Sequence, residues 1–338
     1  MGKLVSVVIP TYNRANIITD AVNTVLKQTY QNFEILIIDD GSTDNTENII
    51  KEIQDQRIKY IYQENNGPAK ARNNGIKHSK GEYIVFLDSD DLWHPELLEK
   101  HIKILNANSN IGMVSNHSLY KTFDGQYIRK KTCQAKNNKE YLRYILTEPD
   151  KAYPGPSTTM FKRECFEKVG YFDETLDFCE DWDMCFRVAL FYEFHCINET
   201  LTYVRVHQNS LSRTREVEKF RNSYLKFLQK AFENTSLLQE ALYNFVSNKH
   251  TLFSCLIKCK LLNIKNKAYS NALWSIGSWA LYKSRDSFVA RKNLMESLKY
   301  SHTKIFNLKF LIALLFSYSP LFMLNVYQKL KKGSGKAY

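Results

Sequence analysis

The chain has 338 residues, of which 44% are hydrophobic and 13% aromatic, so it can bury a large core and does not belong to the class of disordered proteins. Its net charge of +12 is unevenly distributed, because residues 211–338 carry 22 Lys and Arg against 6 Asp and Glu, whereas residues 1–210 carry 25 against 29. An acidic front part and a basic back part predict two regions with different roles.

The cysteine content and the first residues of the chain indicate the cellular compartment of the protein. Seven cysteines, an odd number at irregular spacings, do not form the pattern of a disulfide framework. Cys255 and Cys259 lack the second Cys or His pair that a zinc site needs. The first apolar run, Leu4–Ile9, is too short for a secretory signal segment. We therefore expect a protein of the reducing cytoplasm.

The front part alternates predicted strands and helices. Apolar runs rich in β-branched residues predict strands, and helical periodicity predicts helices between them. The strands lie in 4–10, 33–44, which ends in carboxylates and a Gly-Ser turn, 58–64 and 82–91. The helices lie in 16–29, 46–55 and 67–79, the last of which begins with a loop. This alternation predicts an α/β fold with a mostly parallel sheet covered by helices. Because ligands of such sheets bind beyond the carboxyl ends of the strands, residues 10–13, 39–42 and 88–90 should converge on one crevice.

Three carboxylates follow the fourth predicted strand in EYIVFLDSDDLW, residues 82–93. Asp88, Asp90 and Asp91 lie so close together that their charges repel and raise each other's pKa. One interpretation is that Asp91 caps a helix beginning within 94–105, with its neighbours solvated. The other is a divalent cation, which prefers oxygen ligands and would pair the charges.

The same crevice needs a way to bind phosphate. Neither G-x-x-x-x-G-K-[ST] nor G-x-G-x-x-G follows the first strand, so a P-loop and a dinucleotide fingerprint are both excluded. A metal ion and cationic side chains would then have to neutralise the negative charge of a bound diphosphate. Arg72, in AKARNNG, could be such a cation, or it could be an ordinary arginine on a helix face.

Two further stretches carry candidate side chains. FCEDWDMCFRVAL places Glu180, Asp181 and Asp183 around Trp182 at the start of a helix, where acidic residues either complement the helix dipole or supply a general base beside an aromatic ring. YVRVHQNSLSR follows a predicted strand and contains His207, which is either a surface histidine or a metal ligand.

Together these stretches resemble family-2 glycosyltransferases, inverting enzymes of the GT-A fold that include bacterial surface-polysaccharide enzymes. The matching segments, in order, are SVVIPTYNR, ILIIDDGSTDNT, GPAKARNNGI, GEYIVFLDSDD, VGYFDE, EDWDMCFRV and YVRVHQNSLS. The resemblance covers residues 4–213. It implies a catalytic domain over 1–213, with a nucleotide-sugar half at about 1–115 and an acceptor half at about 116–213.

The resemblance also implies roles for individual positions. On the donor side, the nucleotide would be bound by Pro10, Thr11, Asp39, Asp40, Arg72 and Asp88. A Mn²⁺ or Mg²⁺ ion would be held by Asp90 and His207, with Asp91 as an alternative carboxylate. Asp181 falls at the position of the catalytic base and Trp182 beside it, on the acceptor side.

The chemistry implied is a single displacement at the anomeric carbon. Asp181 would take the proton of an acceptor hydroxyl as that hydroxyl attacks C1, while Arg72 and the metal stabilise the leaving diphosphate. UDP is the expected nucleotide, because Asp40 could accept a hydrogen bond from uracil N3–H. A saccharide or a lipid-linked saccharide is the expected acceptor.

Residues 214–338 match no common element of the family and predict a basic helical region. Eighteen residues without a charge, 310–327, lie between Lys309 and Lys329 and are interrupted by Pro320. They predict either a helical hairpin at a membrane interface, with lysines meeting anionic lipid, or a helix pair packed as soluble core. The first interpretation implies a cytoplasmic protein bound peripherally at the inner face of the plasma membrane.

Two other classes of protein fit the sequence less well. A sugar nucleotidyltransferase would need a Gly-rich loop after the first strand, and PTYNRANI contains no glycine. A non-catalytic scaffold or nucleic-acid-binding protein could use the basic back part. Its lysines, however, alternate with long apolar runs, which suit lipid better than DNA, so no nucleic-acid partner is expected.

Overall fold

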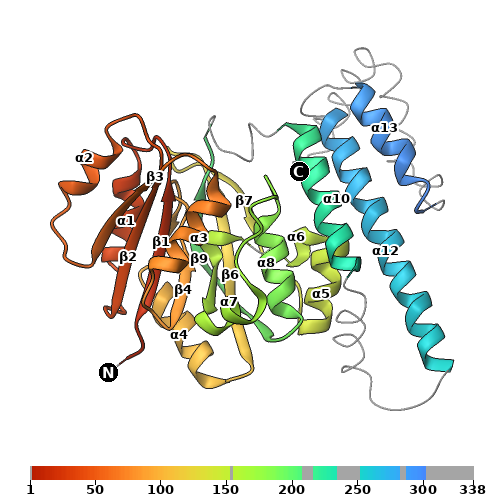
Figure 1. The fold of residues 1–338 in the computed structure, drawn as a ribbon, viewed down its shortest axis with the longest axis horizontal. Coiled ribbons are helices and arrows are strands. Elements are labelled where there is room, and N and C mark those ends of the chain that lie inside the picture. The colour runs from red at the N-terminus through yellow and green to blue at the C-terminus, as the bar shows by residue number, and fades with distance from the viewer. Residues whose placement is uncertain (1, 153–154, 208–215, 234–251, 282–286, 302–338) are drawn as a thin grey trace. The chain divides into compact units, whose positions relative to one another are not determined.

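The computed structural model describes residues 2–152, 155–207, 216–233, 252–281 and 287–301. The chain divides into two compact units, one of Met1–Thr214 with Glu233–Ser247 and one of Arg215–Phe232 with Asn248–Tyr338. Figure 1 shows a sheet with flanking helices in the first unit and helices alone in the second.

The first unit begins with the alternation that the sequence predicts. Its strands are β1 (Val5–Thr11), β2 (Phe33–Asp40), β3 (Ile58–Gln63), β4 (Tyr83–Phe86), β5 (Leu92–Trp93), β6 (Ile111–Lys121), β7 (Tyr127–Lys131), β8 (Thr159–Lys162) and β9 (Glu193–Arg205). Its helices are α1 (Ile18–Leu26), α2 (Thr46–Lys51), α3 (Pro68–His78), α4 (Leu97–Ala107), α5 (Asn138–Thr147), α6 (Pro149–Ala152), α7 (Arg163–Val169) and α8 (Glu180–Ala189), with a 3₁₀ turn at Pro156–Thr158.

The sheet is mixed and mostly parallel. Its strand order is β3-β2-β1-β4-β8-β6-β9-β5, and β7 pairs with β6 at the side of this path. β1, β2, β3 and β4 are parallel to one another; β8 runs antiparallel to both β4 and β6, and β9 is parallel to β6. The carboxyl ends of β1, β2, β4, β6 and β9 therefore share one edge. This confirms the predicted α/β class.

Alternation along β1 explains the layers. All seven residues of β1 are buried, so the strand is covered on both faces. Val5, Val7 and Ile9 belong to a core cluster with residues of α1 and α4. On the other face α3 contacts β1, and a Cβ added at Gly75 would lie 2.2 Å from Val8 Cγ1. Only glycine allows α3 to approach the sheet this closely, and that approach brings Arg72 toward the strand ends.

The second unit contains α10 (Val217–Glu233), α12 (Leu252–Trp279) and α13 (Ser287–Ser297), which confirms the predicted helical back part. Apolar side chains at the end of α12 and along α13 form its core, and Arg221 pairs with Glu296 at 2.8 Å. In the described part of the chain no helix is long and apolar enough to cross a membrane. The uncharged segment 310–327 lies outside the described residues, so its predicted membrane role stays a prediction.

Candidate active site

The carboxyl ends of β1 and β2 form one wall of the candidate site. Thr11 and Asp39 are register partners there, and both side chains are buried, as is Pro10 before them. Asp39 accepts hydrogen bonds from the backbone N–H of Ser42 at 2.8 Å and from the Tyr60 hydroxyl at 2.6 Å. Burial and the Asp39 charge raise the pKa of Tyr60, so the tyrosine stays protonated and holds the carboxylate in place.

Thr11 contributes a buried hydroxyl that is not satisfied within the described residues. Its Oγ1 has no hydrogen-bond partner there, although the side chain is 3% exposed. Buried polar atoms are nearly always paired, because an unpaired one costs the free energy of its lost hydration. A hydroxyl in this state at the carboxyl end of a strand fits a group that faces a ligand.

Asp40 organises the segment that leads into α3. Its carboxylate accepts from the side-chain amide of Gln63 at 2.7 Å and from the backbone N–H groups of Asn66 and Gly67 at 3.0 and 2.8 Å. Gly67 has a φ of 89°, a conformation that favours glycine, and α3 begins at the next residue. Since a carboxylate offers about four acceptor positions, one remains for a ligand.

Arg72 lies in a buried charge network between β4 and α8. Its Nη2 pairs with Asp88 Oδ1 at 2.9 Å and its Nη1 with Glu180 Oε1 at 2.6 Å. The side chains of Arg72 and Glu180 are 5% and 11% exposed, so this pair is shielded from water, whereas the Asp88 side chain is 35% exposed. Arg72 is therefore not an ordinary helix-face arginine. It ties the first aspartate of D-x-D to the helix that carries Asp181.

Glu180 is the site residue whose importance the sequence did not reveal. From the sequence alone, Glu180 is only an acidic neighbour of Asp181 and a possible cap of the helix. In the structure its carboxylate is buried and paired with Arg72, while the cap position of α8, Cys179, makes no side-chain cap bond. No local sequence signal could have found this pair, because Glu180 and Arg72 are 108 residues apart.

Asp181 lies in the first turn of α8 beside a small cavity. The cavity measures about 10 Å³, room for one water molecule at most, and is lined by Phe86, Gly155, Pro156, Phe161, Phe172, Asp181 and Cys185. Burial among these side chains, reinforced by the charge of Glu180, raises the pKa of Asp181 to about 8, although Arg72 opposes the shift. The backbone N–H of Trp182, whose side chain is half-buried, donates to Asp181 Oδ1 at 2.9 Å.

Asp90 and His207 meet although 117 residues separate them. Asp90 Oδ2 and His207 Nε2 are 3.0 Å apart. They meet because β4 and β9 run in the same direction, so the segments that follow them lie at one edge of the sheet. The structure thus brings together the carboxylate and the imidazole that the sequence predicted as metal ligands.

Arg205, which the sequence did not single out, supports this pair. Its Nε donates to the Asp90 carbonyl at 2.6 Å, its backbone N–H to Asp91 Oδ1 at 3.3 Å, and its Nη1 pairs with Asp20 at 2.6 Å. Asp91 is buried, and burial together with the Asp90 charge raises its pKa well above the usual range. Asp91 does not cap α4, which begins at Leu97 without a side-chain cap.

The donor set at this edge fits a hard divalent cation in part. Two ligands in adjacent positions of an octahedral ion with bonds of about 2.1 Å lie about 3 Å apart, which is the separation of Asp90 Oδ2 and His207 Nε2. Within the described residues, no group of three or more His, Cys, Asp or Glu side chains is placed to hold an ion. The remaining ligands would therefore be waters or phosphate oxygens, as is usual for Mg²⁺.

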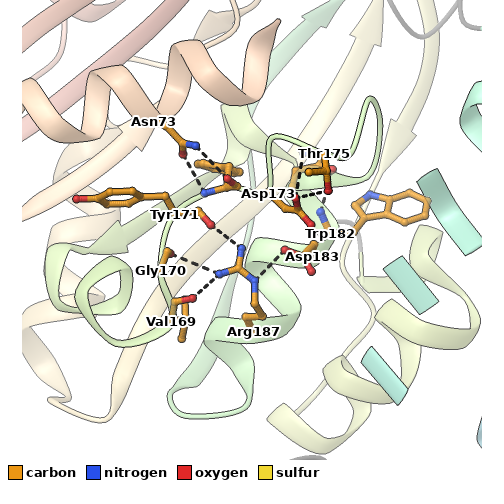
Figure 2. Close-up of polar contacts among 11 residues, drawn as sticks. Asn73, Val169, Gly170, Tyr171, Asp173, Thr175, Trp182, Asp183 and Arg187 are labelled. Carbon is orange, nitrogen blue, oxygen red and sulfur yellow. Dashed lines mark hydrogen bonds and ion pairs between the residues drawn. The ribbon is translucent and has the colours of Figure 1, made fainter. Parts of the chain in front are cut away.

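A second set of polar contacts holds the loop before α8 (Figure 2). Arg187 donates to the carbonyls of Val169 and Tyr171 at 2.6 and 2.8 Å and pairs with Asp183 at 2.8 Å. Asn73, next to Arg72 on α3, exchanges two hydrogen bonds of 2.9 Å with the backbone of Phe172. These contacts position Phe172 at the cavity beside Asp181 and give Asp183 a structural partner.

Known proteins were compared with this chain. Residues 6–170 match the family described as Glycosyl transferase family 2. An uncharacterised glycosyltransferase of Rickettsia typhi is 32% identical over 265 residues, which are 74% of this chain and 80% of that one. The Escherichia coli UDP-Glc:alpha-D-GlcNAc-diphosphoundecaprenol beta-1,3-glucosyltransferase WfgD is 42% identical over 117 residues, 34% of this chain and 46% of the relative.

Among solved structures, S. aureus TarS 1–349 in complex with UDP-GlcNAc superposes with a TM-score of 0.59 at 19% identity, covering 90% of this chain and 92% of that chain. The curled, mostly parallel sheet with its flanking helices is the fold of GT-A glycosyltransferases. The chain belongs to glycosyl transferase family 2, and its general activity is that of a glycosyltransferase.

Proposed function

We propose that the protein is an inverting glycosyltransferase that moves a sugar from a nucleoside-diphosphate sugar to a hydroxyl of a saccharide or lipid-linked saccharide. The observation that carries the proposal is the Arg72 network, because it joins donor-side Asp88 to the helix that bears Asp181. Substrates held on the two sides of Arg72 would have their reacting atoms brought together. This is the arrangement that a single displacement needs.

The donor nucleotide would lie at the ends of β1, β2 and β3. The unpaired hydroxyl of Thr11 and the remaining acceptor position of Asp40 would contact it, while Asp39 holds the turn at Ser42. UDP is the expected nucleotide, because a carboxylate can accept from uracil N3–H. The name of the E. coli relative, a UDP-glucose-dependent enzyme, supports this choice.

Asp181 would act as the general base. A carboxylate with a pKa near the working pH takes up a proton with useful driving force. Phe86, Phe161 and Phe172 line the cavity beside the carboxylate, and the Trp182 N–H fixes its orientation. Attack of the acceptor hydroxyl from the face opposite the diphosphate would invert the anomeric centre.

Arg72 and a Mn²⁺ or Mg²⁺ ion would neutralise the negative charge of the leaving diphosphate. Asp90 and His207 would hold this ion, with Asp91 nearby. When bound, such an ion would supply positive charge that stabilises the diphosphate. Arg72 makes no hydrogen bond through Nε to the described residues, so the Nε–H donor is left for a ligand. Arg205 would keep Asp90 facing His207.

The name of a relative supports a class of acceptor, and the charge of residues 211–338 supports a cellular location. The diphosphoundecaprenol-linked acceptor in the name of the E. coli relative supports a lipid-linked saccharide. The basic charge of residues 211–338 supports peripheral attachment to anionic lipid at the inner face of the plasma membrane.

The test is a donor screen. Purified protein with Mn²⁺ is incubated with a panel of UDP- and dTDP-sugars, and nucleotide release is measured with and without saccharide acceptors. We expect release from a UDP-sugar that falls when the metal is chelated and a β-linked product by NMR when an α-linked donor is used. Absence of release across the panel, or a product that retains the donor configuration, would contradict the proposal.

A further inference from the structure

The β6–β7 hairpin exposes apolar side chains beside the candidate active site. Residues 118–121 of β6 pair with β7 on one side and with β9 on the other, so among the described residues β7 is an edge strand of the sheet. Phe123 is 44% exposed, Tyr127 67% and Ile128 40%. Three large apolar side chains exposed within six residues are a feature of interaction surfaces, because water disfavours such a patch.

The hairpin is also basic in an acidic region. Residues 121–136 contain five Lys and Arg but one acidic residue, Asp124, whereas residues 1–210 as a whole carry a net charge of −4. Arg129 and Lys130 are exposed, and the Arg129 guanidinium lies 4.6 Å from the Tyr120 ring. The positive charge is therefore presented to solvent next to aromatic rings.

Protection of a sheet edge explains only part of this composition. Lysines on an edge strand prevent pairing with other chains, so Lys130 and Lys131 could have that role. The same role does not require Phe123, Tyr127 and Ile128, since exposed apolar groups favour association. Cations interleaved with flat apolar rings suit instead a ligand with anionic groups and apolar faces.

The hairpin is continuous with the candidate active site. Lys121 at the end of β6 is the register partner of Arg205 at the end of β9, and the Val206 N–H donates to the Lys121 carbonyl at 2.8 Å. The Phe123 ring lies 4.5 Å from the Arg205 guanidinium and 5.4 Å from the His207 ring. A ligand bound along the hairpin would therefore reach the edge where Asp90 meets His207.

We infer that the β6–β7 hairpin binds the acceptor, and that the acceptor is an anionic saccharide, carrying phosphate, carboxylate or a similar group. The inference rests on the proposed function, which supplies a reaction centre at the same edge. Phe123 and Tyr127 offer flat surfaces for the C–H faces of sugar rings. Arg129 and Lys130 pair with the anionic groups and give the binding its dependence on salt.

The variants Tyr127→Ser and Lys130→Gln test the hairpin. Phe191→Ser and Lys168→Gln are matched controls, because this ring and this cation are also exposed, lie 5.1 Å apart and belong to segments outside the hairpin. The probes are a dextran sulfate oligosaccharide, a neutral dextran of equal length and phosphatidylglycerol vesicles. Binding of each probe to full-length protein is measured by titration, with UDP affinity and UDP-sugar hydrolysis measured in parallel.

We expect wild-type protein to bind dextran sulfate in preference to dextran. Tyr127→Ser should weaken this binding about fivefold or more, the loss typical of a buried aromatic contact, and Lys130→Gln should weaken it and reduce its salt dependence. The controls should bind as wild type, and UDP affinity should not change in any variant.

Equal binding by hairpin and control variants would overturn the inference, as would a hairpin effect confined to vesicles, which would make the hairpin a lipid contact. Failure of the proposed function is read separately, from loss of UDP binding and donor hydrolysis in the wild-type protein.

Discussion

Asp181→Asn removes the proposed base while keeping the size of the side chain and its ability to accept a hydrogen bond. Binding of donor and acceptor should therefore change little. General-base catalysis contributes about 10²–10⁴-fold, so transfer should fall by a factor in that range. The structure adds a dependence on pH, because the pKa of Asp181 is raised to about 8 by burial and by the charge of Glu180.

The size of the pH effect follows from that pKa. With a pKa of about 8, about one tenth of Asp181 is ionised at pH 7 and about nine tenths at pH 9. Wild-type kcat/KM, which reports the free enzyme, should rise about tenfold over this interval. The asparagine variant has no such group and should give a flatter profile, so the ratio between the two enzymes should widen about tenfold.

Folding stability gives an independent readout with a defined sign. Because the folded-state pKa lies above the unfolded-state value of 3.8, the folded protein retains a proton that the unfolded chain releases between about pH 4 and pH 8. Asp181 therefore contributes less to stability as pH rises through this window. The melting temperature of Asp181→Asn relative to wild type should increase from pH 5 to pH 9.

The assay is transfer under kcat/KM conditions at half-unit steps from pH 6 to pH 9.5, with Glu180→Gln and Asp183→Asn as comparisons. Glu180→Gln should move the wild-type rise to lower pH, since the Glu180 charge contributes to the raised pKa of Asp181. Asp183 pairs with Arg187, so Asp183→Asn should keep the rise at pH 8. Near-wild-type turnover by Asp181→Asn, together with loss in either comparison variant, would show that the base has been assigned to the wrong residue.

Three further predictions concern the rest of the site and the back part of the chain. Asp90→Asn should abolish Mn²⁺-dependent affinity for the nucleoside diphosphate and leave the circular dichroism spectrum unchanged; normal metal-dependent affinity would exclude Asp90 as a ligand. Arg72→Met leaves the buried Glu180 and the half-buried Asp88 without their partner, so urea unfolding should report a loss of about 3 kcal/mol, the lower end for a broken buried pair because Asp88 keeps contact with water. A loss below about 1 kcal/mol would mean that the network contributes little. Truncation before about residue 305 should preserve donor hydrolysis and release the protein from anionic vesicles, and an unfolded product would instead identify the removed segment as core.

Local patterns of the sequence determined the framework of the first unit. The apolar runs that form β1, β2 and β4 stand where predicted, because strands buried at every position are mostly apolar. The strand predicted at 58–64 also forms, as the partly exposed β3. The shared direction of these strands then brings their carboxyl ends to one edge, so the meeting of Thr11 with Asp39 follows from the sequence. The ordered motifs, read together, also predicted the family.

The antiparallel strand β8 was not predicted, because it has four residues and no period that separates it from a loop. It reverses the chain direction once and so sets β6 and β9 parallel to β4. That reversal decides that His207 reaches Asp90 and that the β6–β7 hairpin lies at the same edge. No local pattern carries this information.

Which charges meet was also decided by the tertiary structure. Arg72 and Glu180 are 108 residues apart, and neither position differs locally from an ordinary charged residue near a helix. Their pairing depends on the close approach of α3 to β1 at Gly75 and on the hydrogen bonds that hold the loop before α8. The sequence predicted which residues carry the chemistry. The path of the chain decided their partners and, through burial, the raised pKa of Asp181, because both depend on contacts between distant segments.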